Sequence, residues 1–411
     1  MLSKNNHKPR IRPLDFQPVW HKGQQMWLLR DPQQLSEYQL IFPPLLAQML
    51  VYCDGTSTLT EIQTALSTDA GFPVPLHHLE DALAQLDEAC LLENERFWTA
   101  RKQALSQYRA QPHRPPALAG LSYPADPEEL DFLFAEYGAS DNLNGWRSWS
   151  GRGIISPHID YQRGGPVYAK VWRRAQPAVA EADIVLMFGT DHNGGLGTIT
   201  LTEKAYATPY GVLPTDKEMV QRIAAAIGPE HAFALELNHR QEHAIELSAV
   251  WLHHTYRQLG LEPRPMIPIL CGSFHHFVTH GSHPSQDPQM NSLINVLKEA
   301  TQGKRVLAIA SVDLAHVGPN FGDPFPMDKP RRQAIRESDQ RLMAATRAGQ
   351  ADIFYQEIAQ VRDQNRICGF SSIYLMLRFL ENHQGQEIAY AHCPADDQDN
   401  SLVSICGLLL D

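Results

Sequence analysis

Histidine and aspartate side chains follow three apolar runs of the sequence at the point where each run ends. His158 comes shortly after the run GIIS, His192 after VLMF, and Asp313 and His316 after LAIA. Ligands of open α/β sheets bind outside the carboxyl ends of the strands, so several such residues in one domain favour a shared site. Imidazole and carboxylate groups at such a site can bind a metal ion or transfer protons.

Two further residues could join this group. His243 stands at the start of a predicted helix, with Glu246 three residues later on the same face. The spacing departs from the HxxEH pattern of zinc peptidases, because Leu247 stands where the second histidine would be. Cys368 precedes an apolar helix, whose dipole would favour a thiolate that can ligate a metal. The alternative role of Cys368 is that of a small buried residue.

The elements that would position these residues are buried strands alternating with helices. Five apolar runs are predicted to be strands covered on both faces, at 153–157, 183–189, 266–271, 306–312 and 402–410. Helices are predicted at 217–227, 242–259, 330–348 and 371–382. The sequence therefore predicts the α/β class, with a central mixed or parallel sheet flanked by helices.

A separate small domain is predicted at residues 14–98. It contains a predicted β-hairpin between Pro18 and Leu29, followed by three helices with apolar faces. A β-ribbon with three helices predicts a winged-helix fold. The phrase DGTSTLTEI, which begins at Asp54, resembles PqqD-like domains. This resemblance implies binding of the leader part of peptides that are modified later. The alternative is a generic winged helix used for packing or dimer contacts.

The remaining segments are predicted to connect or extend these two domains. Residues 1–13 are polar and basic, which predicts a flexible tail. Residues 99–117 include the stiff stretch QPHRPP and are predicted to be a linker. The larger domain is then expected at 118–411.

Composition excludes several classes of protein. The formal net charge of −11 gives no electrostatic support for general binding to nucleic acid or to an anionic membrane. No apolar run is long enough to span a membrane, and the N-terminus lacks the apolar region of a signal peptide. The six cysteines are scattered without CxxC spacing, which favours a reducing compartment. We therefore expect a cytoplasmic protein.

The order of motifs in the larger domain resembles the MEMO family, called AmmeMemoRadiSam system protein B in microbes. The resemblance covers about 118–411. The motifs that carry it are AGLSYPAD, SPH, GTDH, TPYG, EHAIE, SVDLAH and ICG, in that order. It implies a fold like that of class III extradiol dioxygenases, which are non-haem iron enzymes.

The resemblance also implies a metal centre formed by His158, His192 and Cys368. His243, Asp313 and His316 would lie beside it as catalytic residues. Two imidazoles and a thiolate suit Zn, Cu or Fe and argue against Mg or Ca. The likeness to the dioxygenase fold favours iron.

This sequence departs from the family pattern next to the proposed ligands. The usual PHAGY reads PHIDY and the usual GPxH reads GTDH, which adds Asp160 and Asp191 near the site. Arg163 adds a cation. These changes put a simple transfer of substrate or activity from the family in doubt.

Three functions remain open from the sequence. The first is a metal-dependent, oxygen-using redox enzyme in which His243 or His316 acts as acid or base. The second is a non-catalytic scaffold that presents a peptide to a separate radical enzyme. The third is metal-assisted hydrolysis with zinc, which the additional carboxylates of Asp160 and Asp191 would suit.

Overall fold

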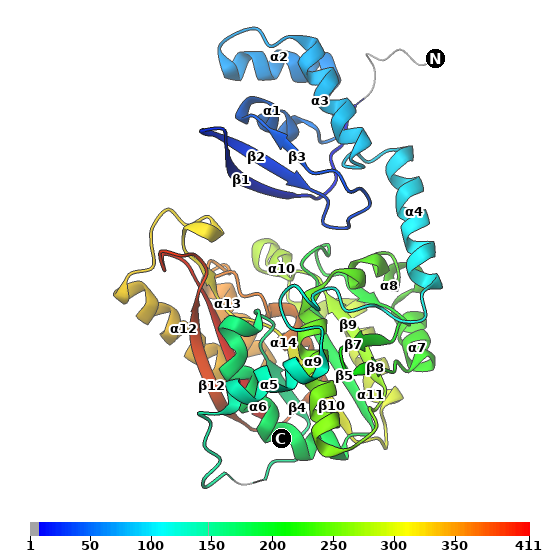
Figure 1. Cartoon of the computed structure of the whole chain (residues 1–411), viewed down its shortest axis with the longest axis vertical. Coiled ribbons are helices and arrows are strands. Elements are labelled where there is room, and N and C mark those ends of the chain that lie inside the picture. Colours follow the sequence, from blue (N-terminus) through cyan, green and yellow to red (C-terminus); the bar gives the residue numbers. More distant parts are fainter. Residues whose placement is uncertain (1–7, 147) are drawn as a thin grey trace. The chain divides into compact units, whose positions relative to one another are not determined.

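The computed structural model describes residues 8–146 and 148–411. The chain divides into two compact units, unit 1 at residues 1–111 and unit 2 at residues 112–411 (Figure 1). Each unit has a hydrophobic core of its own.

Unit 1 begins with a three-stranded antiparallel sheet. Its strands are β1 (Asp15–His21), β2 (Gln24–Arg30) and β3 (Leu40–Phe42), in the order β1-β2-β3. Lys22 and Gly23 connect β1 to β2, with φ angles of 49° and 79°. Two central residues with positive φ are typical of a type I′ turn, whose twist matches that of the strands. The predicted hairpin is therefore present.

Helices cover one face of this sheet. They are α1 (Pro44–Met49), the 3₁₀ turn η2 (Leu50–Tyr52), α2 (Leu59–Ala70) and α3 (Leu76–Glu88). Thr58 caps α2 through a capping box with Glu61, which fixes where that helix begins. Apolar side chains from the sheet and all three α-helices form one core, including Leu29, Met49, Ile62 and Leu79. The resemblance to PqqD-like domains stays a prediction.

The ends of unit 1 differ from the sequence-based prediction. Residues 1–7 of the predicted flexible tail lie outside the described residues. Arg12, however, is buried, forms an ion pair with Asp31 and donates to the carbonyl of Cys90 at 3.1 Å. The tail prediction is wrong for Arg12, because its partners lie far along the chain.

The predicted linker also differs. Residues 95–110 form α4 (Glu95–Ala110), capped by the Asn94 side chain. At its other end the predicted linker includes Arg114, which is completely buried within unit 2. The proline-rich composition suggested a solvated spacer. Helix formation on one side and a buried ion pair on the other shorten it to a few residues around Gln111–His113.

Unit 2 has a mixed central sheet of eight strands. The five predicted strands are all present: β4 (Gly153–Ser156), β5 (Ile184–Thr190), β9 (Met266–Cys271), β10 (Val306–Ser311) and β13 (Leu402–Leu410). The others are β6 (Ile199–Leu201), β11 (His316–Val317) and β12 (Gly385–Pro394). The sheet order is β11-β13-β4-β10-β5-β9-β6, with β12 paired to β13. A separate hairpin is formed by β7 (Tyr206–Thr208) and β8 (Gly211–Leu213).

Four neighbouring strands of this sheet are parallel. β10 lies between β4 and β5, and β5 pairs with β9, all in the same direction. β13 and β6 run antiparallel to the strands they adjoin. Ser311 at the end of β10 pairs with Ser156 of β4 and Gly189 of β5. The carboxyl ends of these three strands therefore meet at one edge of the sheet.

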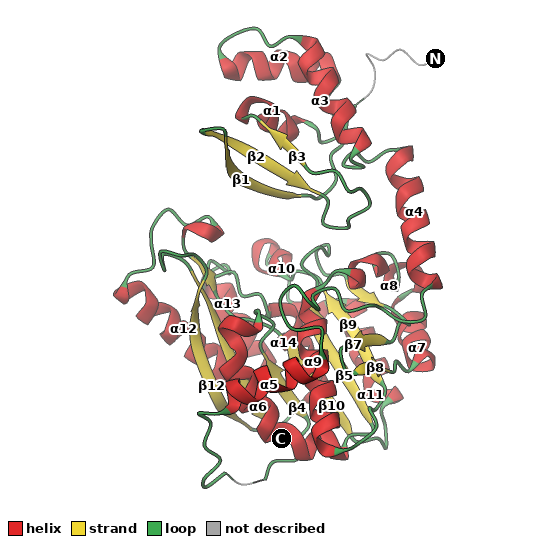
Figure 2. Cartoon of the chain, in the orientation of Figure 1, coloured by secondary structure: helices red, strands yellow, loops and turns green. Residues whose placement is uncertain are grey.

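Helices cover both faces of the sheet (Figure 2). One core contains side chains of α5 (Pro127–Gly138), α6 (Tyr161–Glu181) and α9 (His243–Leu259). The other contains side chains of α7 (Lys217–Ile227), α11 (Pro288–Ala300), α12 (Lys329–Arg347), α13 (Ala351–Gln360) and α14 (Phe370–Leu380). Successive residues of β5 alternate between the two cores, as expected for a strand buried on both faces. The predicted α/β class is confirmed.

Short helical segments complete unit 2. They are α8 (Pro229–Ala232), η3 (Glu236–Arg240), α10 (His275–His280), η4 (Pro284–Gln286) and η5 (Pro319–Phe321). Among the described residues, no helix is long and apolar enough to cross a membrane.

Candidate metal centre

Three histidines from separate elements converge at the carboxyl edge of the sheet. His158 lies two residues after β4, His192 lies two residues after β5, and His243 is the first residue of α9. One ring nitrogen from each lies within 4.8 Å of the others. His158 is buried, whereas His192 is exposed and His243 half-buried, so the group extends from the protein interior to its surface.

Each of these imidazoles is held through its Nδ1 atom. His158 Nδ1 lies 2.9 Å from the carbonyl oxygen of Ser311. His192 Nδ1 and His243 Nδ1 lie 2.9 and 3.1 Å from the same carboxylate oxygen of Glu242. An acceptor at Nδ1 favours the tautomer with its proton there and the lone pair on Nε2. This arrangement of outer partners is typical of metal-binding histidines.

Cys368 lies beside this group and contacts two of its three imidazoles. Its Sγ atom lies 3.1 Å from His158 Nε2 and 3.5 Å from His192 Nε2. Nitrogen and sulfur atoms bound to one ion at about 2.0–2.3 Å, with angles of about 90–110°, are about 3.1–3.6 Å apart. The two Cys368 distances are therefore compatible with an ion shared with His158 and His192. Backbone bonds from Cys368 and Gly369 to the carbonyls of Leu314 and Asp313 hold the cysteine there.

The two catalytic candidates from the SVDLAH motif lie in different positions. Asp313 Oδ1 accepts backbone N–H bonds from His158 (3.0 Å) and Ile159 (3.2 Å), while Oδ2 lies 3.7 Å from His158 Nε2. Burial raises the pKa of Asp313 to about 6. His316 lies outside the three-histidine group, with its ring against Phe321. Burial lowers the pKa of His316 to about 4.

The charges within the group are strongly coupled. Burial and the neighbouring His192 and His243 hold the pKa of His158 well below its usual value. Burial alone would lower the pKa of His192, but Glu242 and Cys368 outweigh it and raise that pKa well above the usual value. A metal ion would have to displace a proton from His192.

Glu242 is the functional residue that sequence reasoning missed. It is 2% exposed, and its carboxylate also accepts the backbone N–H of His192 at 2.9 Å. Its signal in the sequence was an acidic residue at the N-cap of a helix, which is typical of ordinary capping. The predicted shared face of His243 and Glu246 is not used, because Glu246 binds Arg114 and Tyr123 instead.

The additional carboxylates near the site have structural partners. Asp160 caps α6 and pairs with Arg163, whose Nε donates at 2.6 Å. Asp191 accepts from the side-chain amide of Asn238 at 3.0 and 3.1 Å. Because both carboxylates already accept hydrogen bonds from these donors, the argument that either is the base of a hydrolase is weaker.

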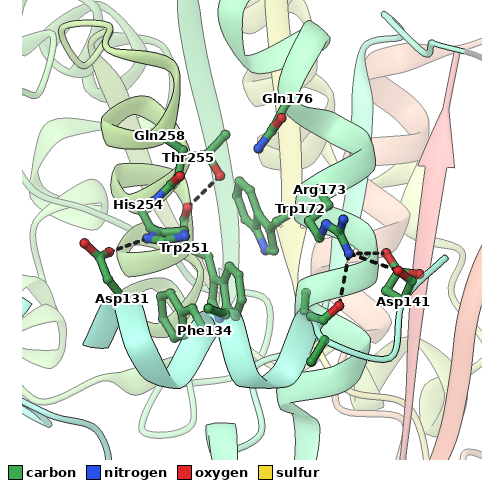
Figure 3. Close-up of a pocket in the computed structure, with 14 residues that line it drawn as sticks. Asp131, Phe134, Asp141, Trp172, Arg173, Gln176, Trp251, His254, Thr255 and Gln258 are labelled. Carbon is green, nitrogen blue, oxygen red and sulfur yellow. Dashed lines mark hydrogen bonds and ion pairs between the residues drawn. The ribbon is translucent and has the colours of Figure 1, made fainter. Parts of the chain in front are cut away.

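A cavity of about 420 Å³ lies elsewhere in unit 2, between α5, α6 and α9 (Figure 3). Its wall includes the aromatic rings of Phe134, Trp172 and Trp251. The charged side chains on its two sides are paired with each other, His254 with Asp131 and Arg173 with Asp141. None of the metal-centre residues lines it. The histidine and cysteine group is therefore the stronger candidate for chemistry.

Comparisons with known proteins agree with the order of motifs. Residues 114–409 match the family described as "Memo-like protein". A MEMO1 family protein of Aquifex aeolicus is 28% identical over 382 residues, which cover 91% of this chain and 91% of that protein. A MEMO1 family protein of Thermus thermophilus is 26% identical over 339 residues, with 81% and 93% covered. One from Methanosarcina barkeri is 25% identical over 268 residues, with 64% and 85% covered.

The extent of these matches bears on both units. Unit 2 comprises residues 112–411, so a match over 91% of the chain also includes much of unit 1. The Aquifex protein is thus similar to this chain beyond unit 2. His158, His192, His243 and Cys368 all lie within the matched 114–409 segment. The chain belongs to the Memo family.

Proposed function

We propose that unit 2 is a metal-dependent redox protein whose metal is non-haem iron. His158, His192 and Cys368 would hold the metal, and His243 would face the same ion. The observation that carries this proposal is the ligand-like spacing of Cys368 Sγ, 3.1 and 3.5 Å from two imidazole Nε2 atoms. The bonds at each Nδ1 support it, because they hold one proton there and leave Nε2 as the atom that can bind a cation, at His192 after loss of its second proton.

Bound iron would supply redox chemistry, and the surrounding residues would orient ligands and manage protons. Asp313 holds the backbone of His158 and keeps that ligand in place. His243 is 39% exposed at its side chain, so it is the member of the group best placed to exchange a proton with solvent or substrate. His316 is proposed as a further acid or base. Burial lowers its pKa to about 4, so the ring is neutral and would hold an accepted proton only transiently.

Metal analysis of protein purified with and without oxygen tests this proposal. Stoichiometric iron with an oxygen-sensitive absorption spectrum is the expected result. Stoichiometric zinc that survives both preparations would instead favour hydrolysis. Protein that is free of metal and does not bind Fe²⁺ on titration would leave the scaffold role.

We also propose that unit 1 recruits a leader-like peptide along the outer edge of β3. An extended peptide can add to a sheet where backbone N–H and C=O groups are unpaired. β1 is the other edge, but it contains Pro18, which has no N–H to offer. β3 has β2 as its single neighbour in the sheet, and its Ile41 is 42% exposed. The β3 edge is therefore the better surface for an added strand.

Binding of a labelled synthetic peptide to the full chain tests this second proposal. The probe is the leader-like sequence of a peptide encoded near the gene, followed by fluorescence anisotropy. Ile41→Lys on the β3 edge should weaken binding, while Trp20→Lys on β1 should not. Equal loss in both variants would contradict the edge assignment. No binding by the unaltered protein would leave unit 1 with a packing role.

A further inference from the structure

Arg114 connects the start of unit 2 to the turn that carries Glu242. The side chain is 0% exposed and forms an ion pair with Glu246. Its Nε donates to the carbonyl of His239 at 2.8 Å, and a terminal nitrogen donates to the carbonyl of Glu242 at 2.9 Å. A guanidinium is planar and its donors are fixed relative to one another. Arg114 therefore sets the distance between the turn before α9 and the first turn of that helix.

Glu246 is the acceptor of the same hydrogen-bond network. Its carboxylate accepts from Arg114, from the backbone N–H groups of Ala117 and Leu118 at 2.8 Å each, and from the Tyr123 hydroxyl at 2.5 Å. These donors all belong to the first segment of unit 2, residues 114–123. The segment is thus bound to α9 one helical turn beyond Glu242.

Glu242 and Glu246 divide two tasks at the start of α9. The Glu242 carboxylate orients the rings of His192 and His243 towards the candidate metal position. The Glu246 carboxylate fixes the helix against Arg114 and Tyr123. Because both groups stand on the first turns of one helix, a shift of this helix moves Glu242 and His243 together.

We propose that Arg114 and Glu246 are positioning residues of the metal centre, acting through Glu242. This inference rests on the proposed metal-binding function. Partners behind metal-bound histidines set the ring orientation, and their loss typically lowers metal affinity about 10- to 100-fold. A buried ion pair that only held the fold together would change stability without changing the metal spectrum.

The experiment measures Co²⁺ binding by the full chain in competition with a chromophoric chelator. The visible absorption of bound Co²⁺ reports the geometry of its ligands, and the melting temperature without metal reports the fold. Arg114→Lys keeps the charge but loses the planar fork. Tyr123→Phe removes one hydroxyl donor to Glu246. This second variant tests the same network if Arg114→Lys does not fold. Tyr210→Phe is the control, since its hydroxyl also donates to a carboxylate, that of Asp131, at 2.8 Å.

A positioning role predicts a change at the metal in both test variants. Arg114→Lys should weaken Co²⁺ binding about 10-fold and shift the Co²⁺ absorption bands, and Tyr123→Phe should do so to a smaller degree. Tyr210→Phe should retain the affinity and spectrum of the unaltered protein. If Tyr123→Phe matches the control, and Arg114→Lys also matches it where that variant folds, the inference is overturned while the metal site stands. If the unaltered protein binds no Co²⁺, the proposed function fails and this inference fails with it.

Discussion

Replacing Glu242 by glutamine tests how the candidate metal centre is organised. One carboxylate oxygen accepts from His192 Nδ1 at 2.9 Å, His243 Nδ1 at 3.1 Å and the Ala244 N–H at 3.0 Å. The other accepts the His192 N–H at 2.9 Å. All four of these partner groups are donors. A glutamine has one acceptor oxygen, and its amide nitrogen must face at least one of these donors.

The magnitude follows from the bonds that are lost. A hydrogen bond to a charged group is worth about 1.5–3 kcal/mol. If glutamine loses one such bond, the histidine that made it is no longer held in its ligand orientation. Metal binding should then become less favourable by about that free energy. At about 1.4 kcal/mol per tenfold, Glu242→Gln should bind Co²⁺ roughly 10- to 100-fold more weakly. The side chain is almost isosteric, so we expect a folded protein.

The assay is chelator competition at about pH 8, with the spectrum of bound Co²⁺ as a second readout. A mildly alkaline pH is chosen because Glu242 and Cys368 raise the pKa of His192, so protons compete with the metal increasingly as the pH falls. Glu236→Gln is a matched control, since that glutamate is also buried but accepts from Thr202. A folded Glu242→Gln protein with unchanged affinity and spectrum would refute the idea that this carboxylate orients the ligands.

Three further predictions concern separate parts of the chain. Metal analysis should show less bound metal in Cys368→Ser, but not in Cys406→Ser, whose cysteine is buried in β13. Equal loss of metal in both variants would leave Cys368 with a structural role only. Burial raises the pKa of Asp339 to about 6 from 3.8, so folding takes up a proton and stability falls as the pH rises through that interval. Asp339→Asn should therefore gain up to about 3 kcal/mol relative to wild type between pH 4 and pH 7, at about 1.4 kcal/mol per pKa unit. If urea unfolding gives the same difference in unfolding free energy between Asp339→Asn and wild type at pH 4 and at pH 7, the prediction is contradicted. Arg12→Met should destabilise unit 1 by about 3–5 kcal/mol, because Asp31 stays buried without its ion-pair partner; a change below about 1 kcal/mol in denaturant unfolding would show that Asp31 is satisfied by other donors.

The strands of unit 2 were predictable, whereas several helices were not. Each of the five predicted strands is a continuous apolar run, and such runs are typical of strands buried on both faces. Helix α6 escaped prediction because it contains Gly164, Gly165, Pro166 and Pro177. At Gly165 a Cβ atom would lie 2.5 Å from the ring of Tyr137 on α5. Glycine is required there because a neighbouring helix packs closely against it, and the local sequence does not reveal that contact.

The sequence by itself determined which residues could bind a metal and where each stands along its element. His158, His192 and Asp313 each follow a strand, so their meeting at one sheet edge follows from parallel pairing. Only the tertiary structure decided what those residues contact. Glu242 looks like an ordinary helix cap, and Arg12 and Arg114 look like solvated charges in polar segments. Arg12 pairs with Asp31, Arg114 with Glu246 and Glu242 with His192, all 19 or more positions away in the sequence. Such contacts depend on the packing of whole elements rather than on local residue pattern.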